Sequence, residues 1–278
     1  MKKFKKIALV LALGTLTLAI AACGKSDKKE VADGVNRPIK VGLVGTKHEE
    51  WDAIKDKLGK EGTQIELVEF TDYNQPNEAL LAGDVDLNAF QHQIFLDNFN
   101  KEKNSNLVSI GDTQLAPLGI YSKKIKDVKE LKEGDKITIP NDVTNGARAI
   151  KLLQTAGLIK AKDVEFPTDK DIVENKLNLE IIPVDASQTA RSLDDVAAAA
   201  INNNVATDAG YIPTKDAIFL EPVDKNSKPY INIIVARPDE KDNEAFKKIV
   251  KAYQTDDTKK IIEKTTKGSS IPAWDIQL

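Results

Sequence analysis

Residues 39–70 read IKVGLVGTKHEEWDAIKDKLGKEGTQIELVEF, and the spacing of their apolar residues changes twice. Ile39–Gly45 and Gln64–Phe70 have the apolar spacing of β-strands. The segment between them places Trp51, Ile54 and Leu58 at helical spacing and ends near two glycines. This order predicts a βαβ unit, in which the two strands are parallel and the crossover is right-handed.

The same alternation continues along the chain. PNEALLAG is predicted to be a short helix, VDLNAF a strand, IFLDNFNKEK a helix and NLVSIG a strand. Further on, KITIPND is predicted to be a strand, NGARAIKLLQTAG a helix and NLEIIPV a strand. Alternating elements of this kind predict the α/β class, with ligands bound at the carboxyl ends of the strands.

Two short segments suggest that the chain forms two similar lobes. Asp84–Phe90 and Asp194–Ile201 each contain Asp-flanked apolar residues, and each leads into a polar loop. The apolar strand Tyr230–Pro238 precedes an amphipathic helix over residues 244–268, which is predicted to pack on the first lobe. We therefore expect a two-lobed α/β fold with a ligand cleft between lobes that close on a hinge. Lobe 1 is predicted at residues 39–120 and 232–278, and lobe 2 at residues 121–231.

The N-terminus has the features of a secretory leader. Four lysines precede an apolar stretch of 16 residues, IALVLALGTLTLAIAA, which is short for a membrane span. The following IAAC is similar to the lipobox of bacterial lipoproteins and predicts lipidation of Cys23. We predict a signal peptide at residues 1–22 and a lipidated cysteine with a flexible tether at residues 23–38. The protein would then be anchored by lipid to the extracytoplasmic face of the cell membrane; a membrane span and a free thiol are the alternatives.

Composition excludes several classes of protein. Residues 1–22 hold four of the 40 Lys and Arg residues and none of the 43 Asp and Glu residues, so the mature chain has a net charge of −7. A mildly acidic chain with dispersed lysines argues against nucleic-acid binding. Cys23 is the only cysteine, so neither an intramolecular disulfide nor a multi-cysteine metal site is possible.

The segment FTDYNQPNEALLAGDVDLNAFQH, residues 70–92, concentrates carboxylates, amides and one of two histidines. The chain has no Gly-x-Ser-x-Gly motif, and two histidines give little material for Ser-His catalysis or a metal site. Its glycines match neither a dinucleotide-binding nor a phosphate-binding motif. Asp84 and Asp86 are interpreted as solvated or capping residues rather than an acid–base pair. We expect no catalytic residue, no metal and no cofactor.

The segment IPNDVTNGARAI is the strongest polar cluster in the second half of the chain. It lies at a predicted strand end and helix start, where backbone N–H groups and the helix dipole favour anions. Arg148, one turn into that helix, could bind a carboxylate through two hydrogen bonds. The alternative is a surface arginine, with Asn141 and Asn145 acting only as caps. Ordinary packing or hydrogen bonding is likewise the alternative for the ring-bearing residues Tyr73, Phe90, His92 and Phe95.

Several long motifs, in order over the mature chain, resemble those of the methionine-binding lipoprotein family, also called the NlpA lipoprotein family. They are the segment at residues 70–92, YSKKIK, IPNDVTNGARAIKLLQ, RSLDD with AAIN, and the terminal IPAW. The resemblance implies a type II periplasmic-binding-protein fold and a cleft that encloses L-methionine or a close relative. It also implies delivery of this ligand to an ABC transporter permease with its ATPase, and we expect the protein to be a monomer.

The family motifs also imply positions for binding residues. FxDYxxPN places Tyr73 at the mouth of the pocket, and FQHxxYL places His92 beside the ligand. Phe95 stands where many members have tyrosine, so the aromatic wall is kept and one hydroxyl is lost. The full binding set that the resemblance implies is Tyr73, Phe90, His92, Phe95, Asn145, Arg148 and Asn202.

The polar head of the ligand is assigned to the second half of the chain. PNDxTNxxR places Asn145 and Arg148 there, and INxxYA aligns with INNNVA, so that Asn202 matches and Val205 replaces an aromatic residue. Arg148 would bind the carboxylate of an amino acid, and amide oxygens of Asn145 and Asn202 would accept from its ammonium group. The aromatic residues would form the slot for a thioether.

The sequence is also compatible with other ligands and other functions. The same trap could hold a methionine-containing dipeptide, D-methionine or another small amino acid. An extracytoplasmic hydrolase and a surface adhesin or sensor are the alternatives from other classes.

Overall fold

The computed structural model describes residues 37–278, which belong to one compact unit. The predicted signal peptide, Cys23 and most of the predicted tether lie outside the described residues. Within residues 37–278, no helix has both the length and the apolarity needed to cross a bilayer.

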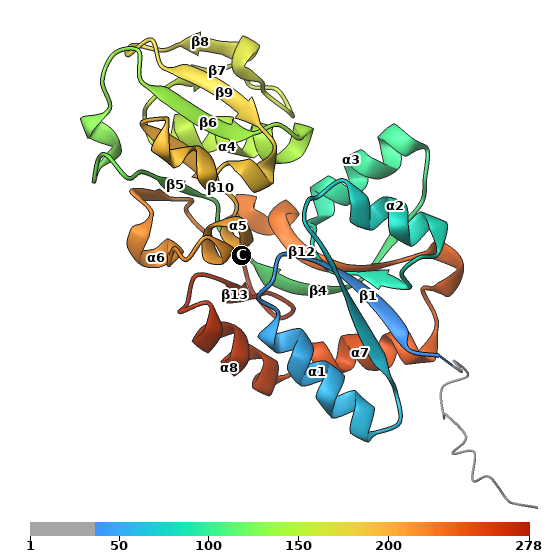
Figure 1. The fold of residues 1–278 in the computed structure, drawn as a ribbon. Coiled ribbons are helices and arrows are strands. Elements are labelled where there is room, and N and C mark those ends of the chain that lie inside the picture. Colours follow the sequence, from blue (N-terminus) through green and yellow to red (C-terminus); the bar gives the residue numbers. More distant parts are fainter. Residues whose placement is uncertain (1–36) are drawn as a thin grey trace, which may run out of the picture. The chain divides into compact units, whose positions relative to one another are not determined.

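The first sheet has six strands and is covered by helices on both faces (Figure 1). Its strands, in spatial order, are β13 (Ile271–Pro272), β4 (Val108–Leu115), β12 (Ile231–Ala236), β3 (Leu87–Asn88), β1 (Ile39–Val44) and β2 (Ile65–Phe70). Its helices are α1 (Glu49–Lys60), α2 (Gln75–Ala82), α3 (Gln93–Lys103), α7 (Glu244–Tyr253) and α8 (Asp256–Thr265). We call these elements the first-sheet region.

The predicted βαβ unit is confirmed. β1 and β2 pair in parallel, from Ile39 opposite Ile65 to Val44 opposite Phe70, with α1 between them in sequence. β1 is followed directly by Gly45, whose φ of +100° lies in the left-handed region that favours glycine. A side chain at Gly45 would also collide with the carboxylate of Asp208.

Alternate residues of β12 divide the core between the two faces of this sheet. Ile234 and Ala236 pack with α1, α7 and α8, whereas Ile233 and Val235 pack with α2 and α3. This is the two-sided burial expected of a central strand in an α/β sheet. Trp51 on α1 is buried in the first of these clusters, as its helical spacing predicts.

The second sheet has five strands. Their spatial order is β11 (Phe219–Leu220), β5 (Gly119–Tyr121), β10 (Ala198–Ile201), β6 (Lys136–Pro140) and β9 (Glu180–Val184). The associated α-helices are α4 (Val143–Thr155), α5 (Asn203–Asp208) and α6 (Pro213–Asp216), and a separate two-stranded sheet consists of β7 (Lys160–Ala161) and β8 (Ile172–Glu174). Short 3₁₀ helices are η1 (Val128–Glu130), η2 (Asp169–Asp171), η3 (Ala186–Gln188), η4 (Arg191–Asp194), η5 (Lys225–Tyr230) and η6 (Pro238–Glu240). We call the elements from β5 to β11 the second-sheet region.

The chain passes between the two sheets twice, from β4 to β5 and from β11 to β12. The predicted lobe limits, after residues 120 and 231, fall inside β5 and β12. The division into lobes at those residues stays a prediction.

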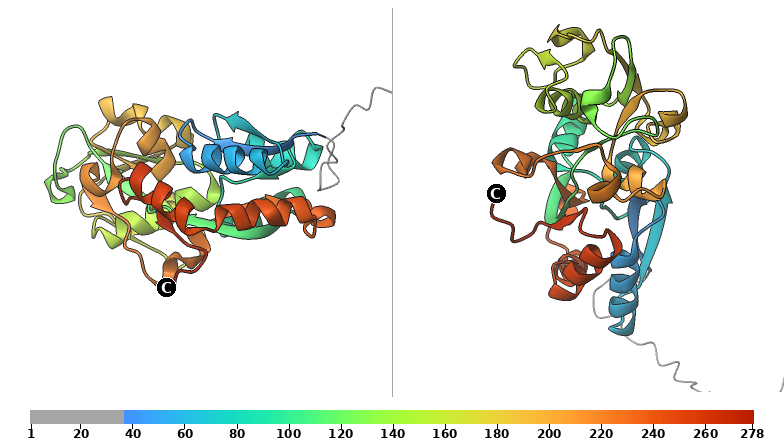
Figure 2. Two further views of the ribbon diagram at one scale, coloured as in Figure 1. Left: turned by 90° about the horizontal axis from the view of Figure 1, so that it is seen from below. Right: turned by 90° about the vertical axis from the view of Figure 1, so that its left-hand side faces the viewer.

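The C-terminal segment differs from the single helix predicted over residues 244–268. It forms α7 and α8, which are separated at Gln254 and Thr255 (Figure 2). Gln254 leaves helical geometry with a ψ of 60°, and Thr255 starts the next helix by accepting a hydrogen bond from the Thr258 N–H. Threonine is a good N-cap residue, so this local signal outweighs the continuous amphipathic pattern.

Asp86 is not the solvated or capping residue that the sequence suggests. It is 3% exposed, and its carboxylate accepts hydrogen bonds of 2.6 and 2.7 Å from Arg37 and one of 2.8 Å from the Lys40 N–H. Arg237 lies 3.7 Å from the same carboxylate. Burial acts to raise the pKa of Asp86, but these donors and cations outweigh it and hold the pKa below its ordinary value. Asp84, by contrast, is exposed.

We expect Asp86→Asn to lower the free energy of unfolding by about 1–3 kcal/mol at pH 7, because it removes charge-assisted hydrogen bonds that fix the start of β1. Since the folded-state pKa is depressed, this stability is present above the unfolded-state value of about 3.9 and is lost as pH falls through the folded-state pKa. Urea unfolding at pH 7 and pH 3 should show the difference between wild type and variant shrinking in acid. Asp84→Asn is the control, because Asp84 is exposed. Equal stability of the two variants would contradict the role of Asp86 in stabilising the fold.

Candidate functional site

One cavity of about 100 Å³ collects all the binding residues that the sequence suggested. By the space a buried water needs, this volume holds on the order of ten water-sized groups, the size of one small amino acid. Residues of both sheet regions line it. The predicted residues among them are Tyr73, Phe90, His92, Phe95, Asn145, Arg148 and Asn202.

Three of these residues form an aromatic box. The ring centroids of Tyr73, Phe90 and Phe95 lie 5.7–6.3 Å from one another, and Phe95 meets both other rings edge to face. Such separations are those of favourable aromatic pairs. The box presents an apolar and polarisable surface to the cavity.

Buried amide side chains within residues 70–92 hold the aromatic box in place. Asn77, Asn88 and Gln91 are buried and donate hydrogen bonds of 2.6–3.0 Å to one another. Because each amide satisfies the next, the network fixes the loop between Asn88 and His92. The amide-rich character of residues 70–92 is therefore largely structural.

His92 joins the aromatic box to the polar end of the cavity. Its Nδ1 accepts a hydrogen bond of 3.2 Å from the Phe95 N–H and caps α3, which leaves the proton on Nε2. Nε2 then donates to Asn145 Oδ1 at 3.3 Å. Burial, together with the charge of Arg148, lowers the pKa of His92 to about 3, so the ring is neutral at physiological pH. With both nitrogens occupied, this histidine is a poor general base.

Asn145 is the centre of the polar network, rather than a cap. The N-cap of α4 is Asp142, which accepts from the Asn145 N–H at 2.9 Å and from Asn145 Nδ2 at 3.1 Å. A carboxylate only accepts, so Asn145 must turn Oδ1 toward His92 and Asn202. Asn202 Nδ2 donates to that oxygen at 2.8 Å. Asn202 Oδ1 is left buried without a hydrogen-bond partner among the described residues.

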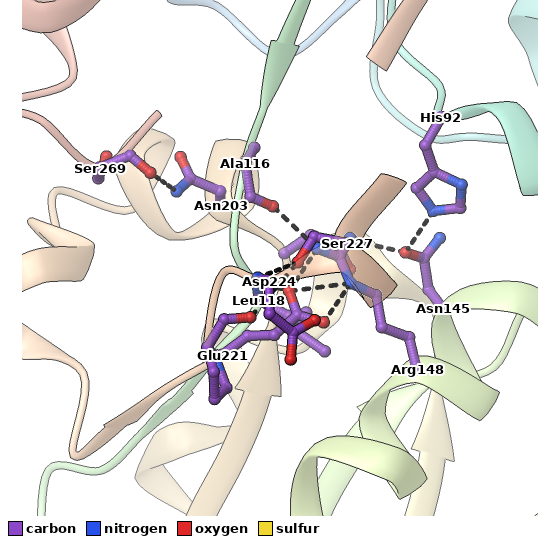
Figure 3. A network of polar contacts seen from close by, with 12 residues as sticks. His92, Ala116, Leu118, Asn145, Arg148, Asn203, Glu221, Asp224, Ser227 and Ser269 are labelled. Carbon is purple, nitrogen blue, oxygen red and sulfur yellow. Dashed lines mark hydrogen bonds and ion pairs between the residues drawn. The ribbon is translucent and has the colours of Figure 1, made fainter. Parts of the chain in front are cut away.

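Arg148 is 3% exposed, so the interpretation as a surface arginine is wrong. Nε and Nη2 donate to Glu221 at 2.5–3.1 Å, and Nη2 also reaches the Ala116 carbonyl at 3.2 Å (Figure 3). The guanidinium lies over the Tyr230 ring, 4.2 Å from its centroid. Within residues 37–278, Nη1 has no acceptor, and it is the amino group left for a ligand.

Glu221 was missed in the sequence. It follows β11 and also accepts a hydrogen bond of 3.0 Å from the Leu118 N–H, so it holds Arg148 against the start of β5 (Figure 3). Its only sequence signal is an acidic residue directly after the apolar segment AIFL. The bidentate face of the guanidinium is thus used inside the protein.

Helix α5 of the second-sheet region bonds to loops of the first-sheet region. Tyr73 Oη donates to Asn204 Oδ1 at 2.5 Å, and Thr46 Oγ1 donates to Asp208 at 3.1 Å. Lys47 Nζ donates to the Thr207 carbonyl. Tyr73, Lys47 and Asn204 also line the cavity, so the contact between the two regions lies beside it.

Val205 and the acidic or histidine side chains do not form a further site among the described residues. Val205 does not line the cavity and packs with the second-sheet core. Within residues 37–278, no group of three or more His, Cys, Asp or Glu side chains is arranged to hold a metal ion.

Two mixed α/β sheet regions that line one polar and aromatic cavity define a substrate-binding-protein fold, as predicted. A family model described as NlpA lipoprotein matches residues 39–274. The D-methionine-binding lipoprotein MetQ of Salmonella typhi is 45% identical over 278 residues, covering 98% of this chain and 99% of the relative. The chain belongs to the NlpA lipoprotein family, which confirms the resemblance seen in the sequence.

Solved structures agree in fold. A nutrient-binding protein from Burkholderia cenocepacia, bound to methionine, is 45% identical with a TM-score of 0.81; the match covers 84% of this chain and 99% of that one. The substrate-binding protein of a methionine transporter from Streptococcus pneumoniae is also 45% identical with a TM-score of 0.81, covering 85% and 96%.

Proposed function

We propose that this chain captures L-methionine outside the cytoplasm and delivers it to an ABC permease driven by its ATPase. One observation carries the proposal: an arginine with an unpaired amino group and an aromatic box line the same small cavity. The names of the relatives, which describe methionine as their ligand, support the choice of amino acid.

In the proposed complex, each part of methionine has a partner. The ligand carboxylate binds Arg148 Nη1, because Glu221 occupies the other donors. The ammonium group donates to Asn202 Oδ1, whereas Asn145 Oδ1 already accepts two protein hydrogen bonds. The thioether lies in the aromatic box, where sulfur–ring contacts stabilise by about 0.3–1.5 kcal/mol each. Pairing both charges is what makes burial of a zwitterion tolerable.

We further propose that Cys23 is lipidated and anchors the protein at the extracytoplasmic membrane face. The family name supports a lipoprotein. We propose a monomer that transfers its ligand without chemistry, since His92 uses both ring nitrogens within the protein.

The test is calorimetry on protein that has been unfolded, dialysed and refolded to remove co-purified ligand. L-methionine should bind tightly with 1:1 stoichiometry, and mass spectrometry of the ligand released on unfolding should detect methionine. Release of a methionine-containing dipeptide or another amino acid, with no heat from methionine, would refute the proposal.

D-methionine is the second candidate, favoured by the name of the Salmonella typhi relative. The two enantiomers share the carboxylate and ammonium but direct the side chain differently from Cα. With Arg148 and Asn202 binding the head group, the two enantiomers would direct the thioether differently relative to the aromatic box. Titration of both enantiomers under the same conditions decides between them.

We expect Tyr73→Phe to weaken methionine binding about 3- to 10-fold, because it removes one hydrogen bond between the two sheet regions and leaves Asn204 Oδ1 without that donor. The loss should come mainly from faster dissociation in stopped-flow measurements. Tyr211→Phe is the matched control, since the Tyr211 hydroxyl has no hydrogen bond among the described residues. An unchanged dissociation rate for Tyr73→Phe would show that this bond does not hold the ligand in.

A further inference from the structure

The cavity extends beyond the aromatic box to the start of α1. There its lining includes Glu50, Thr113, Gln114 and Ser270, from α1, β4 and the segment before β13. Glu50 is 8% exposed. Neither the predicted binding set nor the proposed pairing of methionine uses any of these residues.

Glu50 is a buried acid without a counter-charge. Its carboxylate accepts a hydrogen bond from its own N–H, and within residues 37–278 it forms no ion pair. Burial, with smaller contributions from Glu49 and Asp52, raises the pKa of Glu50 to about 7. A carboxylate held in a cavity at this cost marks a candidate for ligand recognition.

Two amide oxygens in the lining of the same cavity also lack donors. Gln114 Oε1 and Asn202 Oδ1 both belong to residues lining the cavity, and both are buried without a hydrogen-bond partner among the described residues. Asn202 is 8% exposed, so bulk solvent reaches it poorly. Buried acceptors of this kind are normally paired, which indicates that a donor from a ligand completes them.

The charges around the cavity favour a cation beside Glu50. Arg148 and Glu221 neutralise each other, whereas the exposed Lys47 keeps its charge and turns its Nζ toward the Thr207 carbonyl. Glu50 is the one acidic side chain in the described lining of the cavity, and it forms no ion pair there. A positively charged group with several N–H donors is the ligand chemistry that suits a carboxylate and amide oxygens lining one cavity.

We infer that Glu50 and Gln114 form, with Asn202, an ammonium-recognising subsite at the α1 end of the cavity. The inference rests on the proposed function and adds to it a carboxylate that pairs with the ammonium group of methionine. Glu50 would thereby make the protein select amino acids over carboxylic acids of the same shape.

Calorimetry at pH 8, where Glu50 is ionised, tests this with two ligands: L-methionine and 4-(methylthio)butanoate, which lacks only the ammonium group. We expect Glu50→Gln to weaken methionine binding at least about 10-fold and to leave the affinity for 4-(methylthio)butanoate unchanged within about 2-fold. Glu49→Gln is the matched control, because Glu49 is exposed in the same helical turn and shares any effect of the helix dipole. Thermal unfolding confirms that each variant is folded.

The outcomes separate the two proposals. If wild type and Glu50→Gln bind methionine with equal affinity, the subsite is overturned and the proposed function stays intact. A parallel loss for both ligands also overturns the subsite, because it assigns Glu50 a structural role. Failure of refolded wild type to bind methionine overturns the proposed function, and with it this assignment.

Discussion

Replacing Arg148 with alanine is expected to reduce methionine affinity at least about 30-fold, because truncating one partner of a buried, hydrogen-bonded charge pair costs about 2–5 kcal/mol and each 1.4 kcal/mol is tenfold. The variant loses the Nη1 donor proposed for the ligand carboxylate. It also leaves Glu221 beside the cavity without its cation, so a second carboxylate would be repelled there. Calorimetry on refolded protein measures the loss, and Arg191→Ala, at an exposed arginine, is the control.

Two variants of the same ion pair distinguish lost binding from lost stability. Arg148→Ala and Glu221→Gln both break the pair, and both should lower the free energy of unfolding, by about 3–5 kcal/mol when a buried charge is left alone. Only Arg148→Ala removes the cation, so Glu221→Gln should still bind methionine. If the two variants lose methionine affinity equally, the ion pair only supports the fold, and Arg148 does not bind the ligand carboxylate.

The sequence predicts the central geometry of the site because the relevant residues follow local signals. Tyr73 and His92 lie next to the starts of α2 and α3, and Asn145 lies in the first turn of α4. Elements of an α/β sheet direct such positions to one edge. The resemblance to the family supplied the binding set, and these local signals explain why the fold brings residues from separate segments into one cavity.

Partners supplied by tertiary contacts could not be found in this way. Arg148 and Glu221 are 73 residues apart, and Asp86 meets Arg37 49 residues before it. Neither pairing has a local pattern, since an ion pair depends on which loops approach one another. Asp86 was therefore interpreted as a solvated residue, and the bidentate face of Arg148 was assigned to a ligand instead of Glu221.

Glu50 illustrates a different limit. An acidic residue in the first turn of a helix is favoured by the helix dipole, so residue type does not separate Glu50 from Glu49; only the spacing to Ile54 and Leu58 places Glu50 on the inner face. Only the fold shows that Glu49 is exposed and that Glu50 lines the cavity. Helical periodicity predicts which face of the helix is buried, but it does not predict that a ligand cavity lies against that face.

The second large effect is expected at Asn145, which is 2% exposed and connects both sheet regions. Asn145→Ala leaves the Nε2–H of His92 and the Nδ2 of Asn202 without their shared acceptor, and it removes two donors from Asp142. Each unsatisfied buried group costs about 1–3 kcal/mol, so we expect the free energy of unfolding to fall by about 2–4 kcal/mol.

Methionine binding should weaken at least about 10-fold in the same variant, because Asn202 loses the bond that turns its Oδ1 toward the ligand ammonium. Urea unfolding with and without methionine measures both effects, since a ligand that binds only the folded state adds stability in proportion to its affinity. Asn141→Ala is the matched control, because Asn141 is an exposed asparagine just before the same helix. A variant at Asn145 that is destabilised yet binds methionine with wild-type affinity would show that the network supports the fold alone, and that the orientation of Asn202 is set elsewhere.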